Sequence, residues 1–152
     1  MPRRFTKKLR PRRQPMSRSK SSFVDRFERE IVVKFFETLL MIKLFHWKTQ
    51  SYATHKATDE LYGKLNDNMD KFIEILLGKT NSRIDLSSQL SVPLFDLKSA
   101  SELREKIMQF KAYLVNLSNS RFMKVMSNTD LLNIRDEILG DMNQFLYLLT
   151  FH

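Results

Sequence analysis

The stretch HKATDELYGKLNDNMDKFIEILLG, residues 55–78, decides the fold class, because its apolar side chains recur at the spacing of an α-helix. On a helix with 3.6 residues per turn they share one face: Leu61, Leu65, Met69, Phe72, Ile73 and Leu76. Gly78 follows this run and is expected to cap its carboxyl end. The sequence therefore predicts a helix from about Ala53 to Leu77 with one buried face.

The same period appears on both sides of this helix. A capping box at Ser22–Asp25 predicts the start of a first helix that should reach about Lys48. Residues 79–98 contain turn formers and Pro93, so we expect a long connection with one short helical turn near Leu86–Leu90. Apolar periods then predict a helix over residues 100–118 and a last one from about residue 128 to the end of the chain. No segment alternates like a strand.

Two long helices, a long crossover and two further helices predict an all-α protein. The expected architecture is the ferritin-like antiparallel four-helix bundle, with one long crossover and a disordered basic N-terminal tail. We place the tail at residues 1–21 and the bundle at residues 22–152. The eight methionines and twelve phenylalanines of the chain are expected to fill its core.

The tail carries the whole net charge of +9, because it holds nine of the 26 basic residues and no acid, which leaves 17 basic residues against the 17 acidic ones. Its dense like charge and three prolines predict disorder, and such an arm binds polyanions by releasing counterions. We expect sequence-independent binding of DNA or another polyanion; a targeting or solubilising tail is the alternative. The candidate phosphate-binding residues are Arg3, Arg4, Lys7, Lys8, Arg10, Arg12, Arg13, Arg18 and Lys20.

The composition limits the kinds of site that the chain can build. It has no cysteine, so a metal site would use histidine and carboxylate ligands, a set that suits iron or manganese. Charged residues interrupt every apolar run before it could span a membrane. We expect a protein that is intracellular and associated with DNA, or one that is carried in a virion, with no membrane partner.

Four polar residues form a stripe along the border of the buried face of the central helix. Taking His55 as zero, Asp59 lies at about 40°, Asp70 at about 60° and Glu74 at about 100° around the helix axis. None of the three carboxylates has a basic residue four positions later, although such pairing is usual on a solvated face. The spacing therefore leaves two readings open, a divalent metal site and an ordinary acidic helix surface.

With the preceding His46-Trp47 pair, this pattern resembles the Dps-like miniferritins of the ferritin superfamily. Those proteins carry a His-Trp pair at the end of the first helix, then a His, an Asp four residues later, an Asp eleven further on and a Glu four beyond. His46-Trp47, His55, Asp59, Asp70 and Glu74 match in order and type, with identical spacing from His55 to Glu74. The last helix, with Asp141 after an amphipathic run, is also similar, as is the basic tail.

The resemblance implies a ferroxidase site between two subunits. His46, His55 and Asp59 would come from one chain and Asp70 and Glu74 from its two-fold partner. These ligands would bind iron(II), which peroxide or oxygen would oxidise, and no catalytic residue separate from them is implied. The protein would be a homo-oligomer, a dimer at least and a hollow dodecamer if the whole family assembly holds. Trp47 is expected to pack in the core or the interface beside the site.

One departure supports a different reading. The interval from His46 to His55 is three residues shorter than is usual, and KTQSYAT replaces the common Gly-Pro turn, which could displace His46. This shortened form is similar to Dps-like proteins of large DNA viruses and phages. A non-enzymatic structural protein of a virion or nucleoid is therefore the alternative function, and a binding module whose stripe only mediates dimerisation is a third.

Overall fold

The computed structural model describes residues 18–89, 91–125 and 127–151. Its elements are α1 (Arg18–Lys48), α2 (Tyr52–Thr80), α3 (Ala100–Asn116), the 3-10 turn η1 (Leu117–Asn119), α4 (Arg121–Val125) and α5 (Thr129–Leu148). The described residues contain no strand. The prediction of an all-α helical bundle is confirmed, and the four long helices lie where their apolar periods put them.

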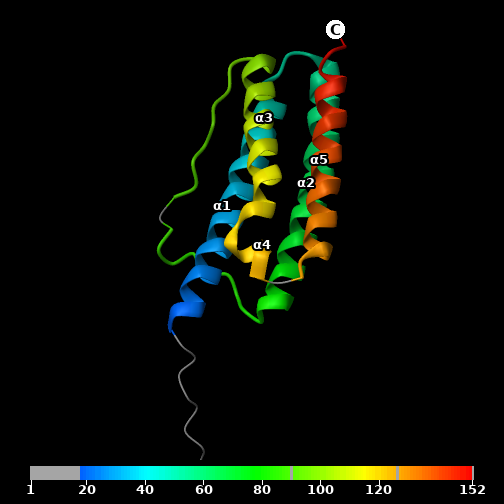
Figure 1. Cartoon of the computed structure of the whole chain (residues 1–152). Coiled ribbons are helices and arrows are strands. Elements are labelled where there is room, and N and C mark those ends of the chain that lie inside the picture. The colour runs from blue at the N-terminus through cyan, green and yellow to red at the C-terminus, as the bar shows by residue number, and fades with distance from the viewer. Residues whose placement is uncertain (1–17, 90, 126, 152) are drawn as a thin grey trace, which may run out of the picture.

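The four long helices lie side by side along one axis (Figure 1). Helix α2 runs antiparallel to α1, and α5 runs antiparallel to α2 and forms its most extensive contact. Between α2 and α3 the chain returns along the length of the bundle, so that α3 starts at the end where α1 meets α2. The crossover thus brings α3 against α1 and α5, and the bundle closes around one core.

The core is built from the faces that the apolar periods predict. Ile31 and Ile42 of α1, Leu65 and Phe72 of α2 and Ile138 of α5 are fully buried. Aromatic rings fill the space between helices, with the Phe35 ring packed edge-on against Phe72 at 5.5 Å and against Phe110 at 6.3 Å. Burial of such side chains stabilises each by roughly 1.5–3 kcal/mol, so this core dominates the stability of the bundle.

The expected start of the first helix is wrong. Helix α1 begins at Arg18 and not at the predicted cap, Ser22, because the last helix-breaking residue of the tail is Pro15 and nothing after it stops a helix. Residues 18–21 are therefore helical and do not belong to a disordered tail. The rest of the predicted tail, including the candidate phosphate-binding residues from Arg3 to Arg13, lies outside the described residues.

The predicted cap of α2 is also wrong. Gly78 lies inside the helix, and the chain leaves it at Asn81, whose backbone is left-handed with φ 52° and ψ 42°. Asparagine tolerates this conformation, and its N–H donates to the Leu77 carbonyl as a glycine cap would. The last turn gains a tertiary contact, because the Thr80 hydroxyl lies 2.7 Å from the Glu28 carboxylate of α1.

The crossover contains one hydrogen-bonded turn where a short helical turn was expected, with the Gln89 N–H donating to the Leu86 carbonyl at 2.8 Å. Its far end is fixed to the end of α1, because Lys48 pairs with Asp96. Lys48, with Lys98 second, lowers the pKa of Asp96 to about 2. Helix α4 was not predicted. No helix in the described part of the chain is long and apolar enough to cross a membrane.

Candidate metal centre

His46 lies in the last turn of α1 and faces the first turns of α2. The imidazole is buried, and its Nδ1 lies 3.0 Å from the His55 carbonyl oxygen and 3.2 Å from the Thr58 hydroxyl oxygen. A carbonyl oxygen can only accept, so the proton of the ring is assigned to Nδ1. The second ring nitrogen, Nε2, lies 3.9 Å from the Asp59 carboxylate, and in the neutral ring it carries the lone pair.

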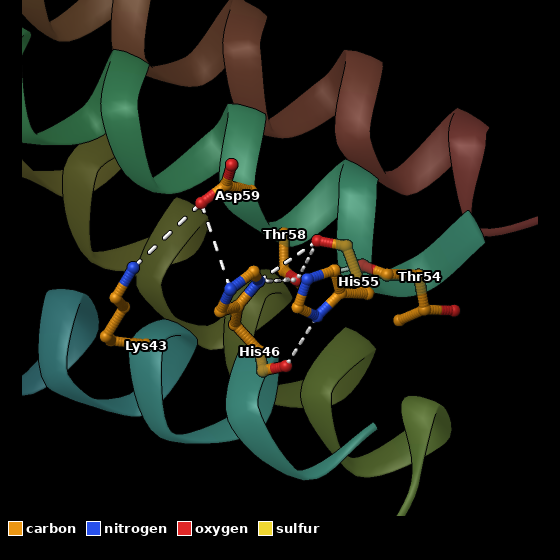
Figure 2. A network of polar contacts seen from close by, with 6 residues as sticks. All are labelled: Lys43, His46, Thr54, His55, Thr58 and Asp59. Atoms are coloured by element: carbon orange, nitrogen blue, oxygen red, sulfur yellow. Dashed lines mark hydrogen bonds and ion pairs between the residues drawn. The ribbon is translucent and has the colours of Figure 1, made fainter. Parts of the chain in front are cut away.

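His55 repeats this arrangement from the other helix. Its Nδ1 lies 3.1 Å from the His46 carbonyl oxygen, so the two histidines exchange ring-to-backbone hydrogen bonds across the α1–α2 turn. Their rings stack with centroids 3.9 Å apart, as Figure 2 shows. The same argument assigns the His55 proton to Nδ1. Both rings are therefore oriented by backbone carbonyls. In known metal sites, a carbonyl that accepts from one ring nitrogen orients the histidine whose other nitrogen binds the metal.

The short connection between the helices brings the two rings together. Helix α1 continues to Lys48, and α2 starts at Tyr52 after the cap residue Ser51, whose hydroxyl accepts from the Thr54 N–H at 3.2 Å. Only three residues separate the helices, so His46 stays on the α1 face that packs against α2. The shortened interval thus leaves His46 and His55 in contact.

Thr58 supports the pair and was missed by the sequence analysis. It is fully buried, and its hydroxyl donates to the Thr54 carbonyl at 2.8 Å or to the His55 carbonyl at 3.0 Å. Its oxygen is then free to accept from the His46 ring. A hydroxyl one helical turn after His55 was the available signal, but only the approach of α1 gives it a role.

Asp59 is the exposed member of this end of the stripe. One carboxylate oxygen lies 3.9 Å from both the His46 Nε2 and the Lys43 ammonium group. Figure 2 shows His46 between His55 on one side and the Lys43–Asp59 pair on the other. Lys43 was also missed, and its ammonium group also lies 4.8 Å from the centre of the Tyr62 ring. Within one chain, Lys43 supplies the positive charge beside Asp59.

Asp70 and Glu74 lie far from these groups. Eleven residues of α2 separate Asp59 from Asp70, which corresponds to about 16 Å along the helix axis. Both carboxylates are exposed, and neither forms a salt bridge or side-chain hydrogen bond with a described residue. The described residues of one chain place no three His, Cys, Asp or Glu side chains where they could hold a metal ion. The predicted ligands therefore form two separate groups. His46, His55 and Asp59 lie at the α1–α2 turn, and Asp70 and Glu74 lie farther along α2.

An apolar groove of about 280 Å³ lies beside Asp70, between α1, α2 and the start of the crossover. Its lining includes Phe36, Leu39 and Ile73. Phe36 is 46% exposed and the neighbouring Leu40 is 42% exposed, so this face of α1 presents two large apolar side chains to solvent beside the groove. Trp47 was expected to pack either in the core or in an interface. It is 70% exposed, so it does not pack in the core of the single chain, and packing in an interface stays a prediction.

Comparison with known proteins identifies one family. No curated protein and no solved structure matches the chain. A family model described as a family of unknown function, DUF5856, matches residues 46–149. The matched stretch begins at His46, so it contains both histidines, the acidic stripe of α2 and helices α3 and α5. The chain therefore belongs to the DUF5856 family.

Proposed function

We propose that the protein is a Dps-like miniferritin: a homo-oligomer that oxidises iron(II) at a site shared by two chains and binds DNA through its basic N-terminal tail. The observation that carries the proposal is the reciprocal pair of hydrogen bonds between His46 and His55. Both rings are oriented through Nδ1, so Nε2 of each neutral imidazole is the nitrogen that would bind a metal ion. The two rings stack, and the His46 Nε2 lies 3.9 Å from the Asp59 carboxylate.

The division of the ligands supports a site between chains. Asp70 and Glu74 face solvent and form no ion pair with a described residue, and they lie four residues apart on one helix, where like charges destabilise each other. A two-fold axis across the α1–α2 face would run α2 of one chain antiparallel to α2 of the other. Asp70 and Glu74 of the second chain would then approach His46, His55 and Asp59 of the first.

The apolar groove supports the same face as the contact. Phe36 and Leu40 would be buried in such a dimer, and the groove next to Asp70 would be filled by the partner chain. A closed two-fold contact uses the same patch on both chains, so one apolar patch beside the ligands is sufficient to form the dimer contact. The dimer is the minimum assembly; a shell of twelve is what the family resemblance implies.

The ligand set suits the chemistry. Carboxylate and imidazole ligands stabilise iron(III) relative to iron(II), so iron(II) bound by them is easier to oxidise than free iron(II). Two iron(II) ions would each give one electron, and one molecule of hydrogen peroxide would accept both electrons with two protons from solvent and be reduced to two molecules of water. The proposed role of this chain is to bind and orient the iron ions, with Nε2 of each histidine and the carboxylate oxygens as ligands.

The test is the growth of ferric absorbance after iron(II) and peroxide are added to the full-length protein. We expect Asp70→Ala with Glu74→Ala to slow it to the rate of free iron. This double variant should keep its fold, because it removes two exposed like charges and no core volume. A matched control, Glu105→Ala with Glu137→Ala, removes two exposed acids from α3 and α5 and should react like the wild type.

Wild-type protein that oxidises iron no faster than buffer, while folded and oligomeric, would contradict the proposal. The structural role in a virion or nucleoid would then be the better account. If the protein were instead a monomer that does not bind DNA, both accounts would fail, and a binding module of another kind would remain.

A further inference from the structure

The end of the bundle where α1 begins gathers basic side chains from three separate segments. Arg26 lies on α1, Arg83 at the start of the crossover, and Arg121 and Lys124 on α4, and all four are exposed. In Figure 1 these segments lie at the same end of the bundle, the end where the described part of α1 begins. None of the four side chains forms a salt bridge with a residue that the structure describes.

Specific contacts fix these segments on α1. The Ser82 hydroxyl donates to the buried Glu28 carboxylate at 2.6 Å, and the Arg29 side chain donates to the Asp85 carbonyl at 3.3 Å. These bonds hold the start of the crossover, and therefore the backbone of Arg83, against α1 about three turns from its start. The Arg83 side chain bonds only a carbonyl, that of Ser82 at 2.7 Å, so its charge stays available.

Helix α4 is attached by aromatic contacts. The Phe122 ring stacks on Phe27 of α1 with centroids 4.3 Å apart, and the Arg121 guanidinium lies 4.7 Å from the centre of the Phe23 ring. The helix is only five residues long, and its outward positions are Arg121, Lys124 and Val125. Its exposed charges are thus held rigidly beside the point where the tail joins α1.

The charge of this end differs from that of the rest of the bundle. The acids exposed here are Asp25, Glu30, Asp85 and Asp130, and Asp130 is paired with Lys79 at 2.8 Å. The other three acids are outnumbered by five basic residues at the same end, Arg26, Arg29, Arg83, Arg121 and Lys124. The sequence before α1 adds further basic residues and no acid. The other exposed acids of α2 and α5 lie farther along these helices, so the near-zero net charge of the bundle conceals a separation of charge.

We propose that this end of the bundle is part of the DNA-binding surface, with Arg83, Arg121 and Lys124 contacting phosphates of the same duplex that the tail binds. The inference rests on the proposed DNA binding and adds a fixed site to it. A disordered arm alone holds a duplex without orienting it. Basic side chains on the folded bundle would position the duplex across its end, because phosphate contacts set orientation without reading sequence.

The test uses the full-length chain and a mixed-sequence DNA duplex, titrated at several salt concentrations. Each phosphate contact contributes about 0.9 to the slope of log K against log salt, so Arg83→Gln with Arg121→Gln and Lys124→Gln should make the slope shallower by about 2.7. Because Arg121 packs on Phe23, the double variant Arg83→Gln with Lys124→Gln is measured too, and it should lose about 1.8.

The matched control is Lys56→Gln with Lys71→Gln and Arg104→Gln, which removes three exposed charges from other parts of α2 and α3. We expect it to leave the slope unchanged. Slopes of the triple and double variants equal to that of the control would overturn the inference and leave the tail as the whole DNA site. Wild-type protein that does not bind the duplex would instead overturn the proposed DNA binding itself.

Discussion

Helices α1 and α2 are joined by a buried polar cluster at each end, and the two clusters differ in what they leave open. At the end where α1 begins, one oxygen of the buried Glu28 carboxylate accepts from the hydroxyls of Thr80 at 2.7 Å and Ser82 at 2.6 Å. At the other end, His46 and His55 form their hydrogen bonds through Nδ1, and Nε2 of neither ring has a hydrogen bond to a described residue.

This difference separates a structural cluster from a candidate site. The polar atoms around Glu28 satisfy one another, so that cluster does no more than fix the crossover to α1. The histidine cluster uses the same kind of bond but leaves Nε2 of both rings without a hydrogen bond to a described residue, and the His46 Nε2 lies 3.9 Å from the Asp59 carboxylate. Only this second cluster therefore offers ring nitrogens that the proposed metal site could use.

The largest expected effect comes from removing residues 1–17, which separates the functions of the two ends. The cut stops at Arg18 because α1 begins there. It removes seven basic residues and should make the salt slope shallower by about 6 and weaken duplex binding about a thousandfold near physiological salt. Iron oxidation should be unchanged.

A variant with those seven residues changed to glutamine, at unchanged length, should behave like the truncated protein. Undiminished DNA affinity in either variant would show that the tail is not the main site. Slower iron oxidation in the truncated protein would show that the two ends are not independent.

The next effect concerns the dimer that a metal site at the His46–His55 cluster requires. Phe36→Asp with Leu40→Asp places two charges in the proposed contact and should raise the dimer dissociation constant by at least about a hundredfold, since each buried apolar side chain is worth roughly 1.5–3 kcal/mol. The monomer should remain folded, because both side chains are partly exposed in the single chain. Light scattering over a range of concentrations measures the change.

Met108→Asp with Val115→Asp is the matched control, since both residues are exposed apolar positions on α3. It should leave the dimer intact. If this control dissociates the protein and the α1 variant does not, the contact lies on α3 and the shared metal site is excluded.

A smaller effect is expected at the cluster of Glu28, Thr80 and Ser82. Glu28→Ala removes the acceptor that the Thr80 and Ser82 hydroxyls share and should lower the free energy of unfolding by about 1–3 kcal/mol. The Ser82 hydroxyl can then donate to the Thr80 oxygen, 2.7 Å away. The Thr80 hydroxyl retains the Leu76 carbonyl at 3.0 Å, which limits the loss. Denaturant unfolding gives the number, and Glu30→Ala, an exposed acid two residues away, is the control. A large loss of iron oxidation in Glu28→Ala with intact stability would contradict the division between the clusters.

The sequence predicted the fold well where one helix decides the outcome and less well where two helices meet. The apolar periods placed the carboxyl end of α1 and the starts of α3 and α5 correctly, because each depends on local pattern and capping. The cap at Gly78 failed because Thr80 bonds to Glu28, a contact with another helix that extends α2.

The candidate site shows the same division. The spacing along α2 identified His55, Asp59, Asp70 and Glu74 as members of one face, which a single helix determines. Thr58 and Lys43 were missed, because their roles depend on the side chains that α1 and α2 bring to each other. Contacts between two chains could not follow from the spacing at all; for those the sequence offered only the family resemblance.

The central claim is that the two groups of ligands meet across two chains, and mixing two inactive variants tests it directly. One variant carries His46→Ala and His55→Ala, and the other carries Asp70→Ala and Glu74→Ala. A mixed dimer then contains one site with all its ligands and one that retains only Asp59. We predict that subunits exchanged between the two proteins recover a substantial part of the wild-type rate of iron oxidation, together with iron-dependent quenching of Trp47, the only tryptophan of the chain. A mixture that oxidises iron no faster than either variant alone, although mixed dimers have formed, would contradict the shared site.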